Sequence, residues 1–89
     1  IGPEGADLTE REITRRNIAF YVLNLALQLQ RGQTAGLIDT RIAAELQESH
    51  AGFLMNLRPE VERIASESPV YREDLSGLIA RVRGLPATA

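Results

Sequence analysis

Residues 18–29 read IAFYVLNLALQL, and ten of these twelve residues are apolar. On a helix, which turns about 100° per residue, one narrow stripe holds the polar side chains in and around this run: Asn17, Tyr21, Asn24, Gln28 and Arg31. The apolar side chains outside the stripe cover roughly 220° of arc, whereas the apolar face of a surface helix is typically ~100° wide. We therefore expect a helix that is covered on two sides, by its own chain or by its chain and a partner.

The same run does not fit a membrane-spanning helix. A span of the hydrocarbon core takes ~20 predominantly apolar residues, and this shorter run contains two amides, Asn24 and Gln28. We therefore expect no membrane partner for this chain.

The helix that holds the run has clear end signals. Thr9 and Glu12 form a capping-box pattern, in which each side chain can bond the backbone N–H of the other residue. Gly32 suits the left-handed position that follows a helix end. We predict a first helix over residues 10–31, preceded by a flexible leader over residues 1–8.

A second apolar stripe follows a short connection in which Thr34 or Asp39 is the next N-cap. The stripe recurs at helical spacing: Ile42, Leu46, Phe53, Leu57, Val61 and Ile64, with His50 and Leu54 in the same arc. Its phase is preserved across Pro59, although an interior proline removes a hydrogen bond and clashes with the carbonyl of Met55. Two structures stay open, one kinked helix or two helices with Pro59 starting the second, and the preserved phase favours the kink.

The last helix is predicted from an N-cap at Ser68 and a first-turn proline at Pro69. Its buried face is expected to contain Tyr71, Leu75, Leu78, Ile79 and Val82. Gly77 costs about 1 kcal/mol in a helix interior relative to alanine, which indicates a close helix crossing at this position. Gly84 and Pro86 end the helix, and residues 85–89 are predicted to form a flexible tail.

The composition limits the possible functions. The 89 residues carry a formal net charge of −2 at pH 7, so no bulk positive charge attracts nucleic acid. Cysteine is absent, which excludes disulfides and thiolate metal sites, and a single histidine disfavours a histidine-based metal site. All ten basic residues are arginine, which we interpret as the codon bias of a GC-rich genome. No signal peptide opens the chain, so we expect a cytoplasmic location.

Residues 41–58, RIAAELQESHAGFLMNLR, resemble a bacterial helix-turn-helix, in which an I-A-x-x-L first helix precedes a turn and a recognition helix. This resemblance implies a DNA-binding regulator. Gln47 stands where the turn usually has glycine, Glu48 where a buried aliphatic residue is usual, and Arg58 is the only cation of the presumed recognition helix. A continuous amphipathic helix is the favoured interpretation, with DNA binding as the alternative function.

The only histidine, His50, suggests a third function, a phosphotransfer hairpin. Such sites expose the imidazole and usually follow it with an acidic residue or a lysine, whereas Ala51 and Gly52 follow here. His50 also lies on the apolar arc, so we predict a structural role in the core or in an interface. The carboxylates of residues 60–74 are spaced as a solvated helix face, and no nucleotide-binding, zinc-protease or hydrolase motif is present.

We predict an all-α fold, a small bundle of three to four helices around the central hydrophobic helix, in one domain over residues 9–84. The other helices are too short to cover the whole apolar arc, and an uncovered half would be larger than monomers usually tolerate. An obligate homodimer is therefore expected. Its predicted interface lies on the first helix: Ile18, Val22, Leu23, Ala26 and Leu29.

The predicted function is a non-enzymatic, self-associating protein–protein interaction module, the dimerisation or regulatory part of a bacterial system. A further protein partner is compatible with this function. We predict no catalytic residue, no cofactor and no metal ligand.

Overall fold

The computed structural model describes residues 9–84, and every regular element within this range is a helix. In chain order these are α1 (Glu10–Thr34), α2 (Thr40–Leu54), a 3₁₀ turn (Met55–Leu57), α3 (Arg58–Glu67), α4 (Pro69–Asp74) and α5 (Ser76–Val82). The all-α class and the small helical bundle are confirmed. The predicted leader and tail, residues 1–8 and 85–89, lie outside the described residues.

Helix α1 begins as the sequence predicts and ends later. Glu12 donates its backbone N–H to Thr9 Oγ1 at 3.1 Å, and Thr9 donates its backbone N–H to Glu12 Oε1 at 2.9 Å, which completes the capping box. The helix continues past Gly32 to Thr34, so the expected end at Gly32 is wrong. The left-handed residue is instead Gly36, with φ +78°, and its backbone N–H donates to the carbonyl of Gln33, in a Schellman-type end.

Gly32 has a different role, inside α1. A Cβ built at Gly32 would lie 2.6 Å from Cδ1 of Ile38, which is too close without a shift of that side chain. The absence of a side chain therefore lets Ile38, in the connection between α1 and α2, pack directly on α1. Asp39, one of the two predicted N-caps, accepts hydrogen bonds from the backbone N–H groups of Arg41 and Ile42 and starts α2.

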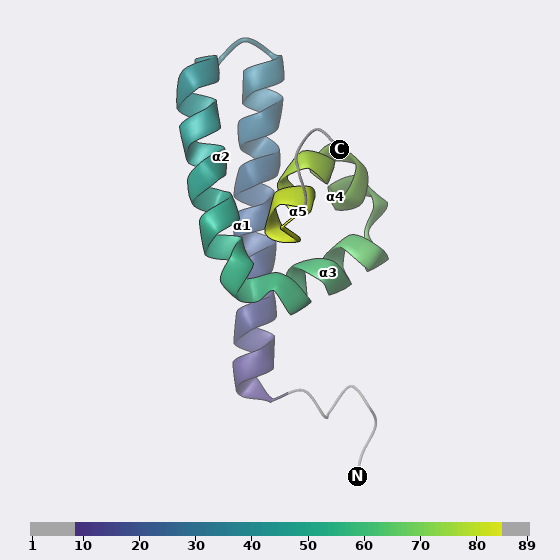
Figure 1. Cartoon of the computed structure of the whole chain (residues 1–89). Helices are drawn as coiled ribbons and strands as arrows, with labels where there is room; N and C mark the ends of the chain where they lie inside the picture. Colours follow the sequence, from purple (N-terminus) through teal and green to yellow (C-terminus); the bar gives the residue numbers. More distant parts are fainter. Residues whose placement is uncertain (1–8, 85–89) are drawn as a thin grey trace.

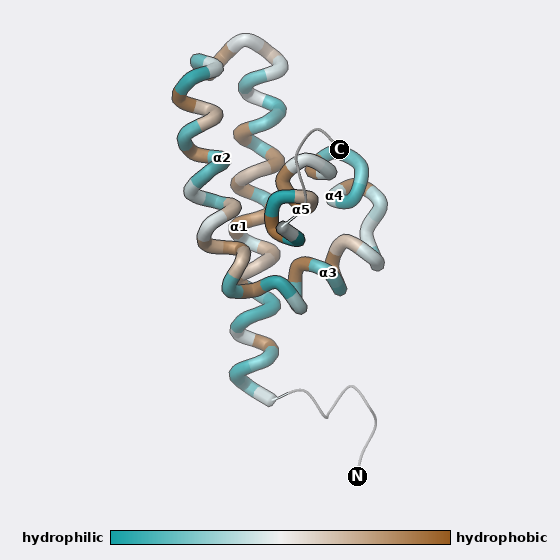
Figure 2. Tube along the Cα trace, viewed as in Figure 1, coloured by the Kyte–Doolittle hydropathy of each residue, from teal (hydrophilic) through white to brown (hydrophobic). Residues whose placement is uncertain are grey.

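Helices α1 and α2 form an antiparallel hairpin, and α3, α4 and α5 gather on one side of it (Figure 1). The part of α1 that extends past α3 is largely hydrophilic, whereas apolar residues concentrate where the helices meet (Figure 2). Helix α1 packs against α2, α3 and α4, and α2 packs against α5. The chain therefore returns onto its own first helix after the hairpin.

The turn after α2 separates two helices, so the favoured kinked helix is wrong. Leu57 has φ −118° and ψ 28°, and α3 starts at Arg58 with Pro59 in its first turn. A first-turn proline loses no helical hydrogen bond, because the N–H groups of that turn have no partner within the helix. The 3₁₀ turn thus accommodates Pro59 and redirects α3 across α1, which the preserved apolar phase had hidden.

The predicted last helix is divided into α4 and α5 at Leu75, which has φ −113° and ψ 28° and is 1% exposed. The expected buried face is otherwise found, because Leu78, Ile79 and Val82 are buried and Tyr71 packs against the core. Gly77 marks no close helix crossing, since a Cβ built there meets nothing within 4 Å.

One hydrophobic core joins the hairpin to the helices on its side. Its largest fully buried side chains come from four helices and the residue between α4 and α5: Leu23, Leu54, Val61, Ile64, Leu75 and Val82. Among the described residues, no helix is long and apolar enough to cross a membrane.

Candidate interaction surface

The α1–α2 hairpin has two unlike sides. We call the side that α3, α4 and α5 cover the closed side, and the other the open side. Helical phase places on the open side five large apolar residues that are 38% to 53% exposed: Ile18, Leu25, Ile42, Leu46 and Phe53. These five side chains define the open face.

A groove of about 370 Å³ runs between the two helices on the open side. Its lining comes from α1, α2 and the connection between them: Leu25, Gln28, Leu29, Ile38, Leu46 and His50. Four of the six are aliphatic, and the other two are an amide and the imidazole, so the lining carries no formal charge at pH 7. The groove is therefore an apolar surface with little electrostatic character.

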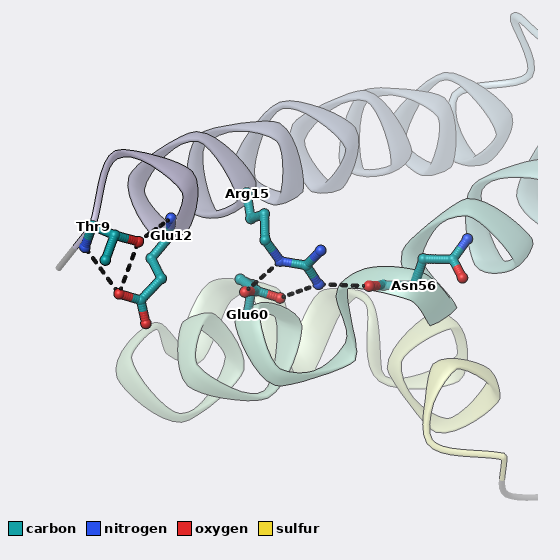
Figure 3. Close-up of polar contacts among 5 residues, drawn as sticks. All are labelled: Thr9, Glu12, Arg15, Asn56 and Glu60. Carbon is teal, nitrogen blue, oxygen red and sulfur yellow. Dashed lines mark hydrogen bonds and ion pairs between the residues drawn. The ribbon is translucent and has the colours of Figure 1, made fainter.

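The closed side is held by polar contacts as well as by the core. Arg15 of α1 donates from Nε to Glu60 Oε2 at 3.0 Å and from Nη2 to the Asn56 carbonyl at 2.7 Å (Figure 3). The hydrogen bond from Arg15 holds the pKa of the Glu60 carboxyl below its usual value. This contact fixes the 3₁₀ turn and the first turn of α3 against α1.

Helix α5 is tied to the hairpin and to α3 by its arginines. Arg81 pairs with Glu48 of α2, and Arg83 donates two hydrogen bonds to Glu62 of α3, at 2.6 and 2.7 Å. Arg58 of α3 in turn donates to the backbone carbonyl of Arg83 at 2.9 Å. By contrast, within residues 9–84 no side-chain hydrogen bond or ion pair joins α1 to α2. Packing alone therefore holds the hairpin at the open side.

The five residues predicted to contact a second chain lie mostly in this chain's own core. Leu23 is 0% exposed and Ala26 is 1% exposed, and Val22 and Leu29 are also buried. Only Ile18 is exposed, and it belongs to the open face. The sequence predicted that a second chain is needed to cover the apolar arc of α1. One chain covers most of that arc, because α2, α3 and α4 pack around α1.

His50 lies at the edge between the core and the groove. Its ring is half-buried, and its Nδ1 atom is buried without a hydrogen-bond partner. Burial lowers the pKa of the imidazole from the ordinary value of 6.5, because desolvation disfavours the charged ring. No carboxylate or cation lines the groove beside His50, although phosphoacceptor histidines usually have such a neighbour.

The turn of the helix-turn-helix hypothesis is absent. Helix α2 continues from Thr40 to Leu54 without a break, so Gln47 and Glu48 are helical, as the favoured interpretation predicts. Two residues of that hypothesis also have partners within the chain. Glu48, at the expected turn, pairs with Arg81. Arg58, the only cation of the expected recognition helix, donates a hydrogen bond to the backbone carbonyl of Arg83.

Titratable side chains of residues 9–84 gather at one hollow but not as a metal site. Within residues 9–84, no cluster of three or more histidine or acidic side chains is arranged to hold a metal ion. The hollow beside the N-terminal part of α1 is lined by two acids and two arginines: Glu12, Glu60, Arg16 and Arg63, with Pro59 between them. Opposite charges there are balanced, and Glu12 and Glu60 are already engaged by Thr9 and Arg15.

Sequence reasoning missed the open face, although a signal for it exists. Ile42, Leu46 and Phe53 were assigned to one buried stripe with the apolar residues of α3, yet each is about half exposed. The small residues Ala43 and Ala51, which are 0% and 4% exposed, instead form the side of α2 that packs within the chain. An alanine-rich helix face indicates close helix packing, and that pattern could have separated the two sides.

Comparison of the chain with protein-family models, with curated proteins and with solved structures gives no match.

Proposed function

We propose that the chain is a non-enzymatic, self-associating interaction module that dimerises through the open face of the α1–α2 hairpin. The observation that carries this proposal is the gathering of five half-exposed apolar side chains on one side of the hairpin, beside an apolar groove. Apolar patches of this kind on a small domain mark association sites more often than inert surface.

The electrostatics of the open face favour a second copy of the same chain as the occupant. In a contact related by a two-fold axis, a side chain close to the axis meets its own copy, so a charged residue there would face a like charge. The described residues that line this groove carry no formal charge at pH 7, so a second copy of the same groove can lie over it without such repulsion. Two hairpins packed in this way form a four-helix arrangement.

The area of the open face supports a dimer of modest affinity. Complete burial of a large aliphatic or aromatic side chain contributes about 1.5–3 kcal/mol. Covering the exposed half of five such side chains on each of two chains therefore contributes on the order of 10 kcal/mol. Association costs about 4–15 kcal/mol in lost freedom, so the two effects are of similar size. Because the net gain is then small, we propose weak self-association, with a dissociation constant of about 10⁻⁴–10⁻³ M, instead of the obligate dimer that the sequence suggested.

Sedimentation equilibrium from ~10⁻⁶ to ~10⁻³ M tests this proposal with a pair of matched variants. Leu46→Glu places a charge in the open face, where Leu46 is 43% exposed. Val70→Glu places the same charge on α4, outside the open face, at a residue that is 47% exposed. The parent chain and Val70→Glu should dimerise with similar dissociation constants, whereas Leu46→Glu should remain monomeric and helical.

Two results would overturn the proposal. One is a parent chain that remains a folded monomer through the whole concentration range. The other is a Leu46→Glu variant that dimerises as tightly as the parent, because an isologous contact at this face cannot accept two facing carboxylates without a large loss.

A further inference from the structure

We propose that His50 makes self-association of the chain dependent on pH, so that the neutral ring accepts a second copy over the groove and the protonated ring excludes it. This inference rests on the proposed function, because it assigns a control to the same open face. His50 lines the groove together with Leu25 and Leu46, which belong to that face.

The first observation is the unpartnered ring nitrogen. Nδ1 of His50 is buried without a hydrogen-bond partner. In the neutral ring this nitrogen can be the acceptor and needs no proton, whereas in the imidazolium both nitrogens are donors. A buried N–H group that lacks an acceptor loses its hydration without compensation. Protonation is therefore already disfavoured in a single chain, in agreement with the lowered pKa of this imidazole.

The second observation is the surroundings of the ring, in which the described lining residues include no carboxylate to stabilise a positive charge. Helix α1 faces it with Leu25, Gln28 and Leu29, and the connection contributes Ile38. The nearest acid along α2 in sequence, Glu48, is paired with Arg81 of α5 on the closed side. Burial of the ring, which disfavours its charged form, lowers the pKa of His50.

A second copy over the groove would remove the solvent that the exposed part of the ring still contacts. The charged ring then loses its remaining hydration, so the pKa of His50 falls further in the dimer than in the monomer. Whenever association lowers a pKa, protons and the partner compete, and the dimer weakens as the pH falls through the monomer's pKa. Two rings act together, because each dimer contains two copies of His50.

The chain suits a clean test, since His50 is its only histidine. Carboxylates ordinarily titrate near 4.5, and those of Glu48, Glu60 and Glu62 titrate lower still. Between pH 7.5 and 5.5 the titrating side chain is therefore His50. The dissociation constant from sedimentation equilibrium should rise over this interval. The rise is below about 100-fold, the limit for two rings with the ordinary pKa of 6.5 that must both be neutral in the dimer.

Two variants and one titration complete the experiment. His50→Gln and His50→Leu should each dimerise with the same dissociation constant at both pH values, and two different replacements guard against misfolding of either one. NMR titration of the His50 ring in the parent chain should give a lower pKa in concentrated protein than in dilute protein. The N-terminal amine is present in the parent and in both variants, so its titration cancels in the comparison.

The possible results separate the two proposals. A parent chain that is monomeric at pH 7.5 overturns the proposed function, and this inference with it. A parent chain that dimerises equally at pH 7.5 and 5.5 leaves the function standing and overturns the role of His50. A pH dependence that persists in both variants, or a His50 pKa that does not change with concentration, also overturns that role.

Discussion

The two sides of the α1–α2 hairpin are built from similar residues but have different surroundings. On the closed side, Leu23 and Leu54 are 0% exposed, and ion pairs at Glu60 and Glu62 hold the covering helices. On the open side, Leu25 and Leu46 are 38% and 43% exposed, and no described polar contact joins the two helices. Leucine side chains thus form part of the core on the closed side and part of an exposed apolar surface on the open side.

From this difference we expect that the fold of one chain does not depend on the open side. The core already includes buried residues of α1, α2, α3 and α5, with Tyr71 of α4 packed against it, so a single chain can bury it without a partner. A change on the closed side should therefore affect folding, and a matched change on the open side should affect association.

Ala26→Glu and Leu25→Glu place the same charge at adjacent residues of α1, the first on the closed side and the second on the open side. Ala26 is 1% exposed in the core, and an unpaired buried carboxylate costs several kcal/mol. A small domain has only ~5–15 kcal/mol of stability, so Ala26→Glu should lose cooperative thermal unfolding followed by circular dichroism. Leu25→Glu should keep it while weakening self-association. Equal loss of folding in both variants would remove the distinction between the two sides.

Leu54→Ala and Leu46→Ala remove the same atoms from two faces of α2. Leu54 is fully buried, so its truncation should lower the free energy of unfolding by about 2–5 kcal/mol. Leu46 is 43% exposed, so its truncation should cost about 1 kcal/mol or less. Urea unfolding of dilute protein measures both values. Losses of similar size would show that the open side is covered within one chain.

The pH dependence of folding in dilute protein should be the smallest effect. The pKa of His50 is lower in the folded chain than its ordinary value of 6.5, so the unfolded chain binds the proton more readily. The free energy of unfolding should consequently be highest above pH 6.5 and decrease as the pH falls below it. Urea unfolding at pH 7.5 and 5.5 should show this decrease in the parent chain. His50→Gln provides the control and should lose most of it; an unchanged decrease would assign it to other groups.

Local patterns in the sequence predict much of this fold. The capping box of Thr9 and Glu12, the N-cap at Asp39 and the polar stripe of α1 are all found, because each depends on residues within one or two turns of a helix. The fold class follows from the same periodicity.

The path of the chain after α2 could not be predicted in this way. The apolar phase is the same on both sides of Pro59, yet the 3₁₀ turn at residues 55–57 sends α3 across α1. The cover that α3 and α4 provide for α1 depends on that return, which is a long-range contact with no local sequence signal. The sequence therefore predicts the wide apolar arc of α1 but not which helices cover it. The exposed apolar residues on α2 were not predicted either.

Intermolecular paramagnetic relaxation can show whether the open side is the surface that meets a second chain. The chain has no cysteine, so Ser49→Cys allows one spin label beside the groove, and Ser66→Cys allows one on α3 as a control. Each labelled chain is mixed with isotope-labelled parent chain, so that broadening reports only contacts between two molecules. We predict that the Ser49 label broadens the methyl signals of Leu25, Ile42 and Leu46, and that the Ser66 label does not. Broadening from the Ser66 label alone, or from neither label at near-millimolar concentration (~10⁻³ M), would contradict this account.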